Sequence, residues 1–199
     1  MNVSFGKKIP ISQYQILDKS SNKFVQATLS EFDCRDKSDI DLFVKDDGWW
    51  NYKDDVVHGM LAKINNMQKY DYLSKEEKAF VDSNKFFAIQ DKDKNLIGVC
   101  VTIDDGTNSD IFFLETKNCN KYKYTGQGMI ASLAKRLISK FQDPTLTVNF
   151  PAPSALTFYI LTCGFKDKDC FSLYMKRPEM TELVDKFEKK TQMPIKTLS

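Results

Sequence analysis

A glycine-bearing loop that opens an amphipathic helix constrains this chain more than any other feature of its sequence. The loop runs over residues 121–128, and the helix after it carries an apolar face of Ile130, Leu133, Ala134, Leu137 and Phe141. This spacing predicts an α-helix of about three to four turns. Two glycines one residue apart at a helix entrance let backbone N–H groups converge, with the positive end of the helix dipole behind them. The loop therefore suits a phosphate or pyrophosphate, and it equally fits a simple tight turn.

Three β-strands in succession precede this loop. We predict strands over Phe86–Gln90, Leu96–Ile103 and Ile111–Thr116, with polar turns at residues 91–95 and 104–108. The succession is antiparallel, whereas the nucleotide-binding loops of Rossmann and P-loop proteins open a βαβ unit. The loop also lacks the Lys-Ser/Thr pair of a P-loop. Both nucleotide-binding interpretations are therefore disfavoured.

Short strands and helices are predicted on either side of this segment. Before it, alternation over Gln13–Leu17 and Phe24–Phe32 predicts a hairpin, a helix is expected from Asp54 to Lys69, and Ser74 with Glu77 has the spacing of a capping box. After it we predict a strand over Thr145–Phe150, an apolar helix from Pro153 to Gly164, a hairpin containing Phe165 and Cys170–Met175, and a terminal helix with Met180, Leu183, Val184 and Phe187.

This order of elements and the loop itself resemble the GNAT superfamily of N-acetyltransferases. The family motif is Arg/Gln-x-x-Gly-x-Gly/Ala, and Lys123, Gly126 and Gly128 stand at its three defined positions. The resemblance covers residues 85–177 and implies an α/β fold with a mixed, mostly antiparallel central sheet flanked by helices. Residues 1–84 would supply acceptor-side elements of the same domain, and residues 178–199 a C-terminal helix and tail.

The resemblance implies acetyl-CoA as the cosubstrate and assigns it to the loop and the strand before it. Loop amides would hold the pyrophosphate, and strand amides near Leu114 and Thr116 would bind the pantetheine arm. The implied loop residues are Lys123, Tyr124, Thr125, Gly126, Gln127, Gly128 and Met129. Lys121, Lys135 and Arg136 are either ligands of the adenosine phosphates or solvated charges.

A second family motif is present in altered form. It reads Asn-x-x-Ala-x-x-Leu/Phe-Tyr with Gly-Phe three residues later, and the matching residues are Ala155, Phe158, Tyr159, Gly164 and Phe165. Ala152 stands in place of the asparagine, and one additional residue separates Tyr159 from Gly164. Because one residue turns a helical side chain by about 100°, Ile160 takes the tyrosine position unless a helical irregularity absorbs the addition.

The chemistry that the resemblance implies is direct attack of an amine on the thioester carbonyl. The amine arrives protonated, with a lysine-like pKa of about 10.4, so a base must remove a proton. Glu115 matches the family's frequent base position, and its alternative is a solvated strand-end carboxylate. Tyr159 is the candidate acid for the departing thiolate, or else a core aromatic.

Composition limits the remaining classes of function. The 199 residues are 42% hydrophobic, but no apolar run approaches the roughly 20 residues of a membrane span. No apolar segment follows the charged N-terminus as in a secretion signal, so we expect a cytoplasmic protein. Five scattered cysteines predict reduced thiols, and with His58 as the sole histidine the sequence predicts no metal site.

The sequence thus predicts an acetyl-CoA-dependent N-acetyltransferase whose acceptor is a primary amine of a small molecule or a protein. The alternative is a non-catalytic acyl-CoA-binding or protein-interaction module with the same fold, favoured by Ala152 and the additional residue before Gly164. The formal charge of +2 argues against nucleic acid as a partner and leaves charged tRNA open. Trp49 and Trp50 either line an acceptor pocket or anchor a small core.

Overall fold

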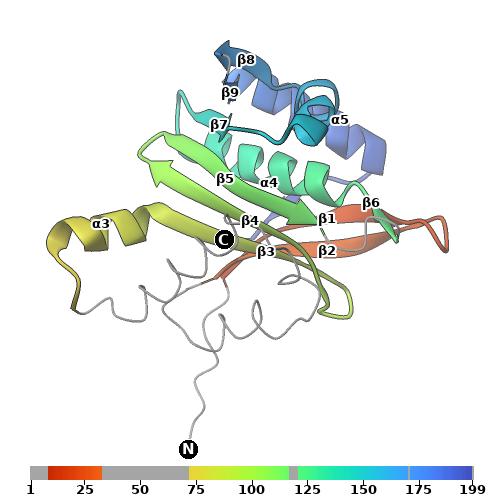
Figure 1. Ribbon diagram of the computed structural model, residues 1–199. Coiled ribbons are helices and arrows are strands. Elements are labelled where there is room, and N and C mark those ends of the chain that lie inside the picture. Colours follow the sequence, from red (N-terminus) through yellow and green to blue (C-terminus); the bar gives the residue numbers. More distant parts are fainter. Residues whose placement is uncertain (1–8, 33–71, 117–120, 170, 199) are drawn as a thin grey trace, which may run out of the picture.

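The computed structural model describes residues 9–32, 72–116, 121–169 and 171–198, which build one sheet with helices packed on it (Figure 1). The strand order is β10-β1-β2-β3-β4-β5-β7-β9-β8, and β6 pairs with β1. Among the described strands, every pairing is antiparallel except that of β5 with β7. The predicted mixed, mostly antiparallel sheet with flanking helices is confirmed.

The strands are β1 (Ile9–Asp18), β2 (Lys23–Phe32), β3 (Asn84–Asp91), β4 (Leu96–Asp105), β5 (Asn108–Thr116), β6 (Tyr122–Lys123), β7 (Thr145–Asn149), β8 (Lys166–Asp169), β9 (Ser172–Lys176) and β10 (Lys196–Thr197). The helices are α3 (Lys75–Ser83), α4 (Thr125–Lys140), the 3₁₀ turn η2 (Pro153–Ala155), the π-helix η3 (Phe158–Cys163) and α5 (Arg177–Thr191). The sequence did not predict β6 and β10, because two-residue strands carry no alternation.

Local signals account for two of the hairpins that the sequence predicted. The Asp18 carboxylate accepts hydrogen bonds from the Ser20 amide at 2.9 Å and the Ser20 hydroxyl at 2.6 Å, which closes the turn between β1 and β2. Between β3 and β4, the Asp91 carboxylate accepts from the amides of Asp93 and Asn95, both at 2.9 Å. Both of these hairpins are confirmed, as is the predicted closing hairpin, which is formed by β8 and β9.

The start of α3 confirms the predicted capping box. Ser74 Oγ accepts from the Glu77 amide at 3.2 Å, and Glu77 Oε2 accepts from the Ser74 amide at 2.8 Å. Two donors at the helix start are thereby satisfied. The helix expected from Asp54 to Lys69 lies outside the described residues, as do His58 and residues 49–50.

The core lies between the sheet and the two long helices, which pack on the same side of the sheet (Figure 1). The sheet contributes Tyr14, Ile16, Leu29, Phe87 and Ile89, α4 contributes Met129, Ile130, Leu133 and Leu137, and α5 contributes Met180, Leu183, Val184 and Phe187. The apolar faces predicted for both helices are the buried ones. Each such side chain contributes about 1.5–3 kcal/mol when it leaves water.

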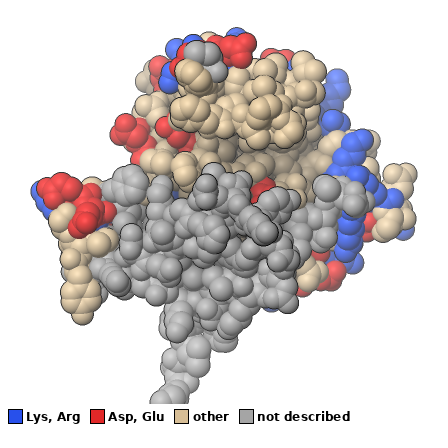
Figure 2. Space-filling view, in the orientation of Figure 1, with Lys and Arg blue, Asp and Glu red and all other residues tan. Residues whose placement is uncertain are grey.

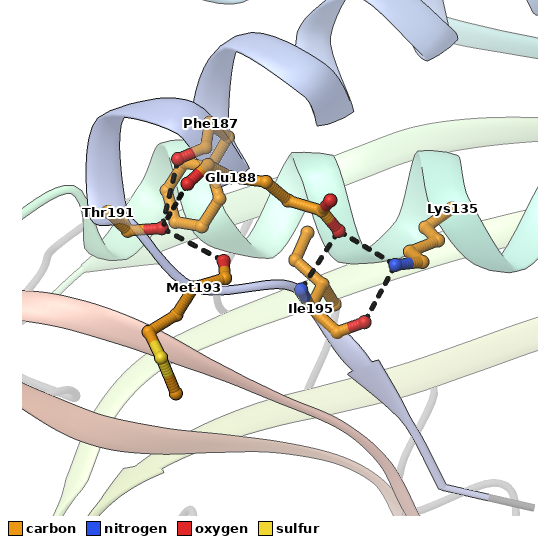
Figure 3. Close-up of polar contacts among 6 residues, drawn as sticks. All are labelled: Lys135, Phe187, Glu188, Thr191, Met193 and Ile195. Atoms are coloured by element: carbon orange, nitrogen blue, oxygen red, sulfur yellow. Dashed lines mark hydrogen bonds and ion pairs between the residues drawn. The ribbon is translucent and has the colours of Figure 1, made fainter.

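The segment after α5 is bound to α4 by a polar network (Figure 3). Lys135 Nζ donates to Glu188 Oε1 and to the Ile195 carbonyl, each at 2.7 Å, and the Ile195 amide donates to the same carboxylate oxygen at 2.9 Å. The Thr191 hydroxyl donates to the Phe187 carbonyl at 3.0 Å near the end of α5. The network turns the chain back to the sheet, where β10 pairs with β1.

Candidate functional site

The ladder between β5 and β7, the one parallel pairing among the described strands, is short. It joins residues 108–111 to residues 145–148, after which β5 continues to Thr116 and β7 ends at Asn149. A β-bulge at Phe112 in the register with β4 marks the same point, and such bulges bend a strand. The β7 side of the last part of β5 therefore lies outside the ladder.

This last part of β5 lies against the first turn of α4. A Cβ on Gly126 would be 3.5 Å from Thr116 Cγ2, 3.7 Å from Leu114 Cδ2 and 3.2 Å from Phe158 Cζ. The fold thus brings together the strand residues and the loop glycine that the sequence assigned to one cofactor. Because successive strand side chains point to opposite faces, Glu115 projects from the face away from α4.

The first turn of α4 presents main-chain N–H groups close to the last residues of β5. Tyr124 caps the helix at φ 75° and ψ 4°, a left-handed conformation that is uncommon for tyrosine. The first N–H groups of a helix have no intrahelical acceptor, so the amides of Thr125, Gly126 and Gln127 can bind an anion. The Gly128 amide already donates to the Tyr124 carbonyl at 2.8 Å. The amides suited to an anion therefore come before Gly128.

Gly128 and Met129, which the sequence also predicts at the cofactor, make packing contacts. A Cβ on Gly128 would lie 2.3 Å from Tyr14 Cε2 and 2.8 Å from Phe187 Cζ, so only glycine fits between β1 and α5. Met129 is fully buried, and its Cε would lie 3.1 Å from a Cβ on Gly98. Both residues thus pack in the hydrophobic core beneath the loop.

Two polar side chains of the first turn are buried. Thr125 Oγ1 and Gln127 Oε1 have no hydrogen-bond partner among the described residues, and each residue is 5% exposed. Gln127 Nε2 donates to the Thr162 carbonyl at 3.2 Å, which ties α4 to η3. The Tyr14 hydroxyl lies 3.4 Å from the Thr125 carbonyl, which it can reach as a donor. The turn is therefore fixed by both η3 and β1.

The helix after β7 decides between Tyr159 and Ile160. It passes from 3₁₀ geometry in η2 to π geometry in η3 and ends at Gly164, whose φ is 85°. A π-helix spaces its hydrogen bonds one residue wider than an α-helix, so it absorbs the additional residue before Gly164. Tyr159 is 6% exposed and Ile160 is 37% exposed. The tyrosine therefore keeps the inner position.

Tyr159 lies among aromatic rings and sulfur atoms. The rings of Phe158 and Phe165 meet it edge-on, with centroid distances of 5.3 and 5.5 Å. Burial raises the pKa of Tyr159, and the nearby Cys100 and Cys163 raise it further. Burial also raises the pKa of Cys163 to about 12, and both thiols are free, as predicted. The phenol is therefore protonated at neutral pH, and its raised pKa makes it a weaker acid than an exposed tyrosine.

Lys135 and Arg136, offered by the sequence for the adenosine phosphates, have structural partners elsewhere. Lys135 belongs to the C-terminal network, and Arg136 pairs with Glu31 at 2.9 Å and lies 5.4 Å above the Phe87 ring. At about 1.5 Å per residue, they stand about 15 Å along α4 from its first turn. Both cations therefore already have a carboxylate partner within the protein.

Sequence reasoning missed Lys190, a cation near the loop. Its Nζ lies 4.5 Å from the centroid of the Tyr124 ring, and Lys123 Nζ lies 5.2 Å from the same centroid. Lys190 belongs to α5, far from the loop along the chain. No local pattern could have found it, because only the packing of α5 on α4 brings the two together.

Two kinds of feature are absent from the described part of the chain. No helix within it is long and apolar enough to cross a bilayer. No three of its His, Cys, Asp or Glu side chains gather as metal ligands would.

No family model and no curated protein matches this chain. Solved structures do. Spermidine/spermine N-acetyltransferase SpeG of Vibrio cholerae is 16% identical, with a TM-score of 0.49 over 78% of this chain and 95% of that one. A GNAT-family acetyltransferase of Staphylococcus aureus is 14% identical, with a TM-score of 0.40 over 52% of this chain and 74% of that one. A Bacillus subtilis acetyltransferase in complex with CoA is 18% identical, with a TM-score of 0.38 over 51% of this chain and 83% of that one. These structural neighbours are GNAT acetyltransferases. The likeness concerns the fold.

Proposed function

We propose that this chain is an acetyl-CoA-dependent N-acetyltransferase that moves an acetyl group to a primary amine by direct attack on the thioester. The observation that carries the proposal is the contact between the first turn of α4 and the part of β5 beyond its ladder with β7. One element offers amides for phosphate, and the other offers a strand edge for an extended amide-bearing arm. A pantetheine thioester of a nucleotide has both of these chemical parts.

The residues of the site fit such a ligand. The amides of Thr125, Gly126 and Gln127 would hold the pyrophosphate, and the backbone of Leu114 and Thr116 would bind the pantetheine arm. A Cβ on Gly126 would fill the space toward Phe158, η3 and β5. The buried, unpartnered Thr125 Oγ1 within this turn adds an acceptor and donor for which the described residues supply no partner.

When bound, acetyl-CoA supplies an activated thioester carbonyl. In our proposal Glu115, on the face of the sheet away from α4, removes a proton from the incoming ammonium, so the amine approaches from that face. Tyr159, on the α4 side, donates its proton to the departing thiolate. The phenol carries this proton at neutral pH, although its raised pKa makes it a weaker acid than an exposed tyrosine. Acid and base thus act from opposite faces of the same strand region.

A non-catalytic acyl-CoA-binding module remains the second candidate. The observation that favours it is the burial of Tyr159, which is 6% exposed and enclosed by Phe158 and Phe165. A phenol that only fills space would leave cofactor binding intact and transfer absent. Ala152, where the family motif has asparagine, points in the same direction.

The test combines ligand-dependent melting with an acceptor screen. CoA at about 100 times its dissociation constant should add about 2.7 kcal/mol to the free energy of unfolding. Acetyl-CoA with a panel of amines should release free thiol, and Tyr159→Phe should slow the responsive reaction by about 10² to 10⁴ while leaving the CoA-dependent shift unchanged. An unchanged melting temperature in millimolar CoA would refute the proposal. A CoA-dependent shift without thiol release from any amine would favour the binding module.

A further inference from the structure

The near-neutral chain carries a local cluster of positive charge beside the first turn of α4. Lys123 and Lys190 both lie over the Tyr124 ring, and Lys121 Nζ lies 4.8 Å from the centroid of the Tyr122 ring. The cluster joins the turn after β1, where the Lys19 amide donates to the Lys121 carbonyl at 2.9 Å. Figure 2 shows lysine and arginine side chains gathered on the side of the molecule where α5 ends and β6 lies.

Packing of α5 on α4 places Lys190 in this cluster. Phe187, three residues earlier and so on the same side of the helix, is fully buried and lies against Gly128 and Tyr14. Hydrogen bonds among Lys135, Glu188 and Ile195 fix the position of α5 along α4. Lys190 is therefore held over Tyr124 by the fold, one turn beyond a core anchor.

The two lysines over Tyr124 keep their charge for an outside partner. Among the described residues, no carboxylate forms an ion pair with Lys123 or Lys190, whereas Lys135 and Lys186 each have one. Their attraction to the Tyr124 ring leaves the ammonium protons available. The adjacent turn adds unpaired amides and the buried, unpartnered Thr125 Oγ1. Both cations thus lie at the residue that caps this turn.

We infer that Lys190, with Lys123, binds the phosphate groups of CoA, so that the C-terminal helix is part of the cofactor site. The inference rests on the proposed function, because CoA is the phosphate-bearing ligand proposed for this turn. CoA carries phosphate at its pyrophosphate and at its 3′ position, and both are anions that ammonium groups bind. The cluster consists of Lys121, Lys123 and Lys190, which suits a single cofactor better than a nucleic acid, whose binding can involve about 6–10 phosphate contacts.

The experiment measures dissociation constants by calorimetry for CoA and for 3′-dephospho-CoA. Lys190→Gln should weaken CoA binding about fivefold, as expected for one exposed charge pair, and Lys190→Arg should restore it. Lys140→Gln is the matched control, since it removes the same charge about 22 Å away at the other end of α4. A loss with CoA alone assigns Lys190 to the 3′-phosphate, and a loss with both ligands assigns it to the pyrophosphate.

Three results would overturn the inference. If the wild-type protein binds no CoA, the proposed function fails and the inference with it. If the wild-type protein binds CoA and Lys190→Gln binds it equally well, the inference alone fails. If CoA binding is indifferent to Lys190 while retardation of bulk tRNA in a gel is lost in the variant, the cluster is a nucleic-acid surface instead. Melting of each ligand-free variant shows whether the fold is intact.

Discussion

Gly126 and Gly128 lie two residues apart in the first turn of α4, yet their surroundings differ. Gly126 faces β5 and η3, where a Cβ would make one tight contact, 3.2 Å to the end of the Phe158 ring. Gly128 faces β1 and α5, where a Cβ would overlap Tyr14 and Phe187 at 2.3 and 2.8 Å. The sequence motif has glycine at both positions and does not reveal that their neighbours differ.

The comparison teaches that one helical turn has two sides, a core side and the side where we propose that the ligand binds, called the ligand side below. The ligand side has unpaired amides and the lysines over Tyr124. The core side is closed by buried rings, with Tyr14 and Phe187 meeting edge-on at a centroid distance of 5.8 Å. Substitutions on the two sides should therefore change different measurements, and this is the basis of the predictions below.

The largest expected effect is on the core side. Gly128→Ala should lower the free energy of unfolding by about 2 kcal/mol or more, because overpacking a filled core costs about 1–3 kcal/mol and rigid rings cannot yield by so much. Urea unfolding measures this loss directly. Gly126→Ala is the matched control, since it is the same change in the same turn. A Gly128→Ala protein as stable as the wild type would remove the core side of the comparison.

A smaller effect is expected on the ligand side. Gly126→Ala should leave the free energy of unfolding equal or slightly higher, since alanine is favoured over glycine within helices by about 0.5–1 kcal/mol. CoA binding should weaken about tenfold, equivalent to about 1.4 kcal/mol, because the methyl group occupies the space toward Phe158. Calorimetry with CoA checks this. Unchanged affinity would mean that the ligand does not approach Gly126.

The smallest expected effect tests the hydrogen bond that joins Tyr122, in the loop, to Asp91. Tyr122, just before Lys123, donates to Asp91 Oδ2 at 2.9 Å. Desolvation alone would raise the pKa of Asp91, but hydrogen bonds from Asn95, Tyr122 and the Asp93 amide outweigh it and hold that pKa below its ordinary value. Asp91→Asn should therefore cost about 1 kcal/mol of unfolding free energy at pH 7.

The sign of the pH dependence follows from the lowered pKa of Asp91. The stability from its ionised form is fully present above the pKa of an unfolded aspartate, about 3.9, and is lost as pH falls through the lower folded value. The difference in unfolding free energy between wild type and Asp91→Asn should thus shrink below about pH 3.9. Urea unfolding at a series of pH values measures it, and a constant difference would assign Asp91 a purely steric role.

Much of the fold could be predicted because its signals are local. The capping box of Ser74 and Glu77, the aspartate-closed turns and the apolar faces of α4 and α5 depend on residues within a few positions of one another. The loop of the candidate site was visible for the same reason. The irregular helix before Gly164 was one of two alternatives, since the sequence gives the count of residues but not which backbone geometry absorbs it.

The sequence by itself determined most of the strands, the described helices and the glycine-bearing loop for which phosphate binding is proposed. Only the tertiary structure decided that Tyr159 and not Ile160 is buried, and that Gly128 packs against the core. It also decided that Lys190 lies over the Tyr124 ring of the loop, whereas Lys135 pairs with Glu188. Hydrogen-bond periodicity acts over a few residues and is written in the local pattern. Which side chains meet across α4, α5 and β1 depends on how rigid elements pack, and that is fixed by the whole core at once.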